Sequence, residues 1–321
     1  MTSVVIEPTD ELDPRLLEHR RELTGYCYRM LGSTFDADDA VQDTIVRAWQ
    51  KIDEFEGRSS LRSWVYRIAT NVCLDALRGR KRRALPMDMS SPVPSTTPPV
   101  ETLPHEVFVE PVPDNAITRD PAELAVHQES VRLAFVAALQ HLPPKQRAVL
   151  ILREVLGWQA AEVAGLLETS VASVNSALQR ARATLTVTDV ERSRSGSLDA
   201  DERELLAKYV AAFESYDIDR LVSLLHEDGS ISMPPFAMWI AGRDELKGWY
   251  TGYGAGCEGS KMIPVAANGM PAFAHYKPSP DGSRLVPWAI QVLEIRDGKI
   301  AHIHHFLDTR LFERFGVPQA L

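Results

Sequence analysis

Few cysteines and no long apolar run set the first limits on what this chain can be. The 321 residues include three cysteines, Cys27, Cys73 and Cys257, with no CxxC pair and no nearby histidine at metal-ligand spacing. This excludes a disulfide scaffold and a cysteine-based metal site, so we interpret all three as buried free thiols. No apolar stretch approaches the roughly 20 residues that a membrane span needs, and the N-terminus lacks a basic segment followed by an apolar one. We therefore expect a cytoplasmic protein with no metal, no cofactor and no membrane partner.

Positive charge is also in short supply, and its distribution is informative. Lysine and arginine number 35 against 44 aspartates and glutamates, which gives a net charge of -9. Such a chain has few basic side chains to bind phosphate over most of its surface. One short stretch is nevertheless basic with almost no acid in it, which predicts local contact with nucleic acid. Its basic residues are Arg58, Arg62, Arg67, Arg78, Arg80, Lys81, Arg82 and Arg83.

Residues 13–83 form the first of three regions, and their pattern is helical throughout. Asp13 followed by Pro14 is typical of a helix start, and apolar residues then recur at helical spacing until Gly32. Aspartates cluster within residues 36–39, at the start of a second helix, where the helix dipole favours anions. A third helix begins after residue 60. We expect an all-α bundle.

Residues 84–121 are rich in proline, serine and threonine, which prevents regular helix. The segment is longer than a structureless loop within a compact domain usually is. We therefore predict a flexible linker between two separate domains. Val107, Phe108 and Val109 are an exception, because adjacent apolar residues are suited to docking on a folded surface.

The second helical region, residues 122–187, contains a helix-turn-helix pattern. Gln159 to Leu167 is the predicted support helix, residues 168–170 the turn, and Val171 to Ala183 the recognition helix. Any amphipathic helix pair shows a similar periodicity, so the pattern alone does not settle the function. The residues on the outer face of the recognition helix and at its flanks are of types that read base edges or bind phosphate in the major groove. They are Ser173, Asn175, Ser176, Gln179, Arg180 and Arg182.

Residues 199–321 combine two amphipathic helices with strand-like segments separated by Gly and Pro turns, which predicts an α+β domain. The clearest signal is Arg296-Asp297-Gly298-Lys299, a hairpin turn between the apolar segments 290–295 and 300–306. The chain as a whole is therefore expected to be multidomain, with two all-α domains and one α+β domain.

The third helix of residues 13–83 carries one polar face of mixed chemistry. Trp64, Arg67, Asn71, Asp75 and Arg78 lie on it, opposite the apolar stripe. Bases freed from a duplex stack on aromatic and guanidinium planes while arginines neutralise phosphate, so this face suits melted DNA. A solvated helix face with Trp64 in the core explains the same pattern equally well. The helix-turn-helix decides between the two, because one module for opened strands and one for duplex make a promoter-recognition architecture.

Two stretches resemble regions 2 and 4 of the extracytoplasmic-function sigma factors, which belong to the sigma-70 class. Region 2 is matched by DADDAVQDTIVRAWQKIDEFEGRSSLRSWVYRIATNVCLDALRGRKRR and region 4 by LPPKQRAVLILREVLGWQAAEVAGLLETSVASVNSALQRARATL. The resemblance covers about the first half of the chain, in the family's order. The family commonly has Gly in the turn where this chain has Glu168, which puts the local turn geometry in question.

The resemblance implies a function, two partners and roles for individual residues. The function is that of an alternative sigma factor, which directs promoter-specific initiation with core RNA polymerase (β′ clamp helices and β flap) and promoter DNA as partners. Polymerase contact is implied for Asp38, Asp39, Asp43, Thr44, Arg47 and Trp49. Contact with the melted minus-ten element is implied for Arg62, Trp64, Arg67, Asn71, Asp75 and Arg78. The outward residues of the recognition helix would read the minus-thirty-five duplex.

The C-terminal domain resembles the SnoaL-like, ketosteroid-isomerase-like cone in MPPFAMWIAGRDELKGWY and in the final hairpin DGKIAHIHHFLD. This fold hosts enzymes and plain binding modules, so it assigns no activity by itself. We expect it to regulate the sigma factor without catalysis, and a small molecule of unknown identity is a candidate partner for its pocket. Because alternate strand residues face opposite ways, some of His302, His304 and His305 should face solvent or a partner. The candidate pocket residues are Trp239, Trp249, His275, Trp288, His304 and Asp308.

Two other functions remain open from the sequence. A cyclase or isomerase tethered to promoter DNA would use His304 or Asp308 as an acid or base. A ligand-sensing, one-component regulator would bind duplex DNA without polymerase. Such a regulator has no need for the acidic helix or for the Trp64 face, so co-purification with core polymerase separates it from a sigma factor.

Overall fold

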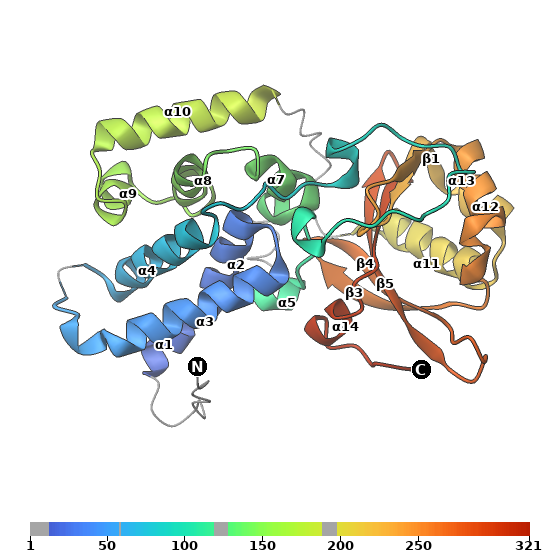
Figure 1. The fold of residues 1–321 in the computed structure, drawn as a ribbon, viewed down its shortest axis with the longest axis horizontal. Coiled ribbons are helices and arrows are strands. Elements are labelled where there is room, and N and C mark those ends of the chain that lie inside the picture. Colours follow the sequence, from blue (N-terminus) through green and yellow to red (C-terminus); the bar gives the residue numbers. More distant parts are fainter. Residues whose placement is uncertain (1–12, 58, 119–127, 188–197) are drawn as a thin grey trace. The chain divides into compact units, whose positions relative to one another are not determined.

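The computed structural model describes residues 13–57, 59–118, 128–187 and 198–321 (Figure 1). Arg58 and the predicted boundary at residues 121 and 122 lie outside these ranges. By their internal contacts the described residues divide into two units. The helical unit contains residues 13–80, 116–118 and 139–187, and the C-terminal unit contains residues 81–115, 128–138 and 198–321.

The first part of the helical unit is a bundle whose helix ends follow the sequence signals. It comprises α1 (Pro14–Glu18), α2 (Arg20–Leu31), α3 (Thr34–Gln50), the short turn η1 (Ile52–Glu54) and α4 (Leu61–Ala76). Asp13 caps α1 by accepting the Arg15 N–H, and Gly32 ends α2 in the left-handed conformation at φ 71°. Ser33 and Ser60 cap α3 and α4 through their side chains. The second and third predicted helices are confirmed, whereas the first is divided into α1 and α2 at His19.

The second part of the helical unit contains the predicted helix-turn-helix. It comprises α8 (Pro144–Leu150), the π-helical turn η4 (Ile151–Val155), α9 (Ala160–Leu166) and α10 (Val171–Val187). Glu168 adopts φ 51°, the left-handed conformation for which glycine is best suited. The turn therefore keeps the geometry that glycine would give, at the expense of some backbone strain.

The helical unit joins the two predicted domains through a buried arginine. Arg147 is 3% exposed and donates to Gln140 Oε1 at 2.6 Å, to the Leu142 carbonyl oxygen at 3.2 Å and to the carbonyl oxygen of Met30 in α2. These bonds satisfy carbonyl groups from both parts of the chain, so separating them would leave buried polar atoms without donors. The expected separation into freely joined domains is therefore not what the structure has.

The C-terminal unit contains a six-stranded sheet, and most of its helices pack against one face. The strand order is β2-β1-β6-β5-β4-β3, and all neighbours are antiparallel except β1 and β6. Tyr209, Phe213 and Trp249 from the helices pack with Leu293 and Ile303 from the sheet to make the core. The strands are β1 (Leu225–Ser232), β2 (Trp239–Ala241), β3 (Lys261–Ala267), β4 (Met270–Pro278), β5 (Leu285–Arg296) and β6 (Lys299–Phe306). The helices are α11 (Ala200–Glu214), α12 (Ile218–Ser223), α13 (Arg243–Thr251), η5 (Tyr253–Cys257) and α14 (Leu311–Arg314).

The hairpin predicted between residues 290 and 306 is confirmed. Asp297 and Gly298 connect β5 to β6 with φ angles of 51° and 68°. Both central residues of a type I′ turn need positive φ, which explains the Asp-Gly pair. The β3–β4 connection, Asn268-Gly269, uses the same solution, with φ angles of 57° and 65°.

The proline-rich segment is part of the C-terminal unit, contrary to the expectation of a flexible linker. It contains η2 (Pro86–Asp88), η3 (His105–Val107) and the start of α5 (Asp114–Ile117), and Figure 1 draws it as the teal and green chain preceding α5. The Val93 N–H donates to the Trp239 carbonyl oxygen at 2.9 Å, and the Leu103 N–H donates to Pro235 at 2.9 Å. Proline prevents helix but leaves extended backbone that can pair with a sheet edge. The docking predicted for the apolar residues near 108 agrees with this, since Phe108 is fully buried.

Candidate nucleic-acid interface

The recognition helix α10 presents the polar residues predicted for it. All six predicted side chains are exposed, while Val174, Leu178 and Ala181 on the opposite side are buried. Arg182 pairs with Glu154 of η4 at 2.5 Å, which anchors the helix at one flank. The exposed set thus offers one uncommitted guanidinium, that of Arg180, beside hydroxyl and amide groups, which suits contact with base edges and phosphate.

The polar face of α4 is open along part of its length. Asn71 and Asp75 are exposed, and so is Arg78, which lies beyond the end of α4 and not on the helix as predicted. Trp64 is half-buried and packs against Phe55 with ring centroids 5.2 Å apart, so it is neither in the core nor fully in solvent. An aromatic edge next to an amide and a guanidinium group can stack with and bond to an unpaired base.

Two arginines of the α4 face contact the second part of the helical unit. Arg67 Nη2 donates to the Gly165 carbonyl oxygen of α9 at 3.0 Å, and its Nη1 lies 3.9 Å from Glu168 Oε1. The Arg62 guanidinium carbon lies 5.3 Å from the ring centroid of Trp158. Both arginines remain 42% exposed. Each of these arginines therefore combines contacts within the protein with surface that is open to solvent.

The predicted polymerase-binding helix α3 presents a mixed set of charges. Asp39, Asp43 and Arg47 are exposed, and Asp43 and Arg47 pair at 3.4 Å. Asp38 and Trp49 are half-buried. Thr44 differs from the rest because it is fully buried and its hydroxyl donates to the Ala40 carbonyl oxygen at 2.7 Å. Thr44 therefore supports the helix from inside and offers no surface to a partner.

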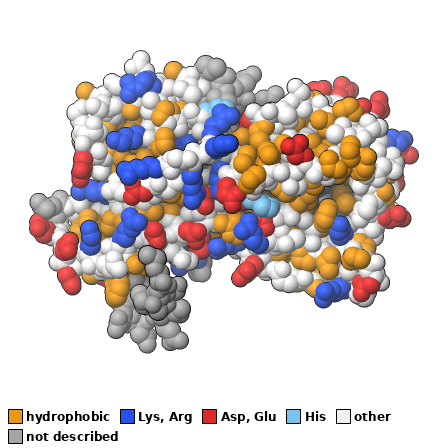
Figure 2. Space-filling model, viewed as in Figure 1, with side chains coloured by type: hydrophobic (Ala, Val, Ile, Leu, Met, Phe, Trp, Pro, Cys, Tyr) orange, Lys and Arg blue, Asp and Glu red, His pale blue; other side chains and the backbone are white. Residues whose placement is uncertain are grey.

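Acidic and basic side chains are mixed over the face drawn in Figure 2. No single-sign surface covers that view. Among the described residues, no helix combines the length and apolarity that crossing a membrane requires. Within the same ranges, no three His, Cys, Asp or Glu side chains are grouped to hold a metal ion.

The six candidate pocket residues do not meet at one place in the C-terminal unit. His275 and Trp249 lie on the helix-covered face, where the His275 ring is 5.0 Å from Phe213. His304 points to the other face and bonds to Ser232 and Glu294 at 3.2 and 3.1 Å. The remaining three contact other segments: Trp239 donates to the Ser90 carbonyl oxygen, Trp288 stacks with Lys277, and Asp308 binds Arg310.

The three histidines of β6 are all buried, which corrects the expectation that some face solvent or a partner. His302, His304 and His305 are at most 6% exposed. Burial holds the pKa of His302 and of His275 well below the ordinary value, so both are neutral. One cysteine also differs from expectation, because Cys257 is only half-buried whereas Cys27 and Cys73 are buried.

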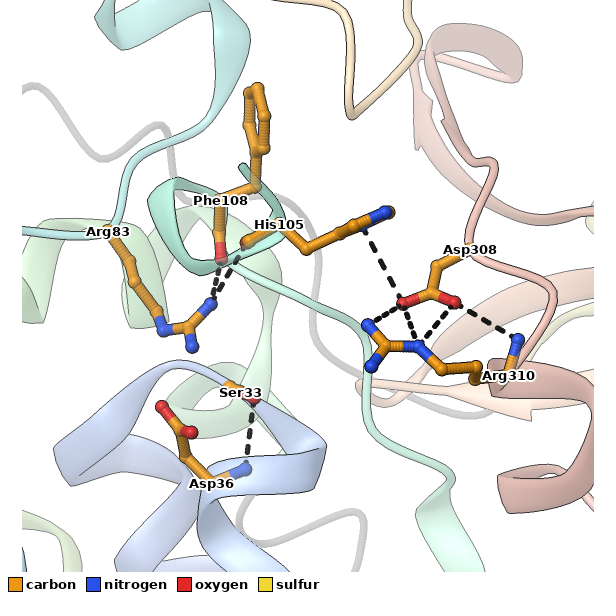
Figure 3. Close-up of polar contacts among 7 residues, drawn as sticks. All are labelled: Ser33, Asp36, Arg83, His105, Phe108, Asp308 and Arg310. Carbon is orange, nitrogen blue, oxygen red and sulfur yellow. Dashed lines mark hydrogen bonds and ion pairs between the residues drawn. The ribbon is translucent and has the colours of Figure 1, made fainter. Parts of the chain in front are cut away.

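Asp308 has a structural partner set that the sequence did not reveal. Its carboxylate accepts from Arg310 at 2.6 Å and lies 3.6 Å from His105 Nδ1 of the proline-rich segment (Figure 3). Burial raises the pKa of Asp308, but the hydrogen bonds and the charge of Arg310 outweigh it and lower the pKa below its ordinary value. The same segment is closed on itself by Arg83, which donates to the Phe108 carbonyl oxygen at 2.7 Å. Asp308 thus anchors the segment, and its ionised carboxyl is already engaged.

Comparison with known proteins assigns these features to one family. Family models match as sigma-70 region 2 over residues 16–83, sigma-70 region 4 over residues 132–185 and a SnoaL-like domain over residues 206–303. The chain is 44% identical to the ECF RNA polymerase sigma factor SigG of Mycobacterium tuberculosis, over 98% of this chain and 87% of that protein. The chain belongs to the extracytoplasmic-function sigma factors. Its regions 2 and 4 thus contain α4 and α10 respectively.

Similarity to a second sigma factor extends to the fold. The chain is 28% identical to SigJ of M. tuberculosis over 93% of its own length and 94% of that protein. The crystal structure of M. tuberculosis SigJ matches with a TM-score of 0.62 at 25% identity, over 95% of this chain and 99% of that one. The C-terminal domain is therefore shared by sigma factors with the same architecture. As a sigma factor, this protein acts in transcription initiation with core RNA polymerase and promoter DNA.

Proposed function

We propose that the C-terminal domain regulates this sigma factor by holding the segment between regions 2 and 4, and that it does so without catalysis. The observation that carries the proposal is the inclusion of residues 81–115 in the C-terminal unit. Backbone bonds to Trp239 and Pro235, together with the Asp308 contact with His105, attach this segment at several points. A segment attached in this way cannot use its full length.

The length of this segment matters because regions 2 and 4 bind different promoter elements. We infer that α4 engages the melted minus-ten element through Trp64 and Asn71, together with Arg78 just beyond its end. We also infer that α10 reads the minus-thirty-five duplex through Arg180 and its polar neighbours. Asp39, Asp43 and Arg47 of α3 would face polymerase. Two linked modules that bind separate DNA elements bind more tightly as a pair when the segment that connects them is long enough to span the distance between the elements. Release of the held segment should therefore raise initiation.

The absence of catalysis is supported by the state of the candidate acids and bases. The His275 ring lies between Ser260 and Gln291, at 2.9 and 3.0 Å, and is fully buried. Asp308 is committed to Arg310 and His105, and His304 to Ser232 and Glu294. To act as a general acid or base, each of these groups would first have to give up a bond that it makes within the protein.

Run-off transcription with purified core polymerase tests the regulatory proposal. Promoters are first selected from genomic DNA by the full-length sigma factor. Glu245 Oε2 accepts the Ser95 N–H at 2.6 Å, so the double variant Glu245→Ala/Asp308→Ala removes two attachments of the segment. We expect initiation to rise several-fold, with region 2 and region 4 unchanged. The neighbouring acid on α13 provides the matched control, Asp244→Ala, which should behave as the native chain.

Two outcomes contradict the proposal. Initiation that is unchanged or lowered in the double variant, at equal affinity for core polymerase, would show that the attached segment does not restrain the protein. Turnover of a small hydrophobic substrate, lost in Asp308→Asn or His304→Ala, would instead make the C-terminal domain an enzyme.

A further inference from the structure

The two tight hairpin turns of the C-terminal sheet have the same backbone and different surroundings. Asn268-Gly269 and Asp297-Gly298 both adopt positive φ at both residues. Asp297 and Gly298 are exposed, as hairpin turns usually are. Asn268 is 0% exposed. The turn between β3 and β4 is therefore covered by other parts of the same unit, and the covering residues come from two separate stretches of sequence.

The first covering stretch is the end of the proline-rich segment. The Val112 N–H donates to Asn268 Oδ1 at 3.0 Å, and the Asn268 N–H donates to the Val112 carbonyl oxygen at 3.1 Å. Pro113 pairs with Ala267 as an antiparallel bridge. The Gly269 N–H donates to Asp114 Oδ1 at 2.8 Å. Both the backbone and the side chain of the turn thus bind this stretch.

The second covering stretch is the helical turn at residues 128–131, immediately before region 4. Asn268 Nδ2 donates to the Val131 carbonyl oxygen at 2.6 Å, and the Gln128 amide donates to the Gly269 carbonyl oxygen. Helical geometry breaks at residue 132 before α7 (Leu133–Leu139) begins, so Val131 lies at a helix end, where carbonyl groups lack partners within the helix. The Asn268 amide supplies the missing donor. Val131 is fully buried, so water cannot replace it.

We propose that the β3–β4 turn is the surface by which the C-terminal domain holds residues 128–131, directly before region 4, with the Asn268 amide as a two-sided clamp. Its oxygen holds the end of the preceding segment at Val112, and its nitrogen holds the entry to region 4 at Val131. The partner that fits this surface is a helix end with a free carbonyl group. Opening the clamp would leave the Val131 carbonyl oxygen without the donor that Asn268 supplies. This inference rests on the proposed regulatory function and names the contact that controls it.

Only an amide side chain at residue 268 can both accept the Val112 N–H and donate to the Val131 carbonyl oxygen. Aspartate at residue 268 would still accept the Val112 N–H but has no donor for Val131, and its charge would lie near that carbonyl oxygen. Glycine at residue 268 would keep the backbone conformation and remove both side-chain bonds. A Cβ at Gly269 would lie 2.5 Å from Gln128 Cγ, whereas one at Gly298 would meet nothing within 4 Å. The exposed hairpin therefore provides a control for each change.

Hydrogen exchange in the full chain, read by mass spectrometry, tests the clamp directly. In Asn268→Gly we expect exchange at least tenfold faster in peptides covering residues 108–116 and 128–138, because two buried hydrogen bonds are lost. In Asn268→Asp the increase should be confined to residues 128–138. Gly269→Ala should have the same effect on that peptide as Asn268→Gly. The controls Asp297→Gly and Gly298→Ala share the turn type and should leave both peptides as in the native chain.

The outcomes for the clamp and for the regulatory proposal are distinguishable. If Asn268→Gly and Gly269→Ala left residues 128–138 protected to within twofold of their matched controls, the clamp would be refuted. Faster initiation by Glu245→Ala/Asp308→Ala would in that case still support regulation through the segment. Conversely, faster exchange without any change in initiation in either set of variants would keep the clamp and refute regulation.

Discussion

Replacing Asp114 by asparagine is expected to stabilise the C-terminal unit near neutral pH. Burial raises the pKa of Asp114 from its ordinary 3.8 to about 6, and this side chain is only 8% exposed. Its Oδ1 accepts the Gly269 N–H. Asparagine has nearly the same shape and can accept the same bond, but it carries no charge to desolvate.

The size of the effect follows from the difference between the two pKa values of Asp114. A rise from 3.8 to about 6 is roughly two units, and each unit corresponds to about 1.4 kcal/mol. Because the folded state holds the proton more tightly, the stability that Asp114 contributes is complete below 3.8 and is lost as the pH rises through 6. At about pH 7.5 the charged carboxyl therefore destabilises the folded state by about 3 kcal/mol. We expect the asparagine variant to recover about 1 to 3 kcal/mol, since its amide nitrogen also needs a partner.

Urea unfolding of the full chain at about pH 4.5, 6 and 7.5 measures this difference, with the transition of the C-terminal unit followed by circular dichroism. The advantage of Asp114→Asn should grow by about 2 kcal/mol between the lowest and the highest pH. Asp281→Asn provides the control. Hydrogen bonds from Ser279 and Ser283 lower the pKa of Asp281 to about 2, so its carboxyl is ionised in both folded and unfolded states over most of this range. Its effect should vary little with pH. A pH-independent effect of Asp114→Asn, or destabilisation at pH 7.5, would refute the reasoning.

Three further results are expected. Arg180→Ala should weaken binding to the minus-thirty-five duplex by about 1 to 3 kcal/mol. Trp64→Ala and Asn71→Ala should instead slow open-complex formation and leave duplex affinity unchanged. If gel shifts showed that all three variants lose duplex binding equally, the separate roles of α4 and α10 would be contradicted. Arg147→Ala should destabilise the helical unit by about 3 kcal/mol or more, because several buried carbonyl groups lose their donor, and an unchanged urea midpoint would show that water replaces it. Glu168→Gly should stabilise the same unit by about 1 kcal/mol by relieving its positive φ, which a lower thermal midpoint would contradict.

Local signals in the sequence predicted the elements of this protein well. The Asp13-Pro14 start, the Gly32 end and the Asp297-Gly298 turn each fix a backbone conformation through the chemistry of one or two residues. The exposed face of α10 followed from periodicity, because a helix with one buried side must present the other. The SnoaL-like and sigma regions were predicted from motifs of the same local kind.

Contacts between residues far apart in the chain could not be predicted from the sequence, because no local pattern encodes them. Asn268-Gly269 and Asp297-Gly298 give the same turn signal, yet only the first is covered by Val112 and Val131. The candidate pocket residues were grouped by residue type, and the register of the sheet then placed them on different faces. A polar residue in a sequence does not show which partner it will meet.

The sequence by itself determined the family, the helices and strands, and the polar faces of α4 and α10, because propensity, capping and periodicity act over a few residues. The tertiary structure decided that the proline-rich segment belongs to the C-terminal unit, that the β6 histidines are buried and that Asn268 holds two segments at once. Those outcomes depend on which backbone groups of distant residues satisfy each other's hydrogen bonds once water is excluded.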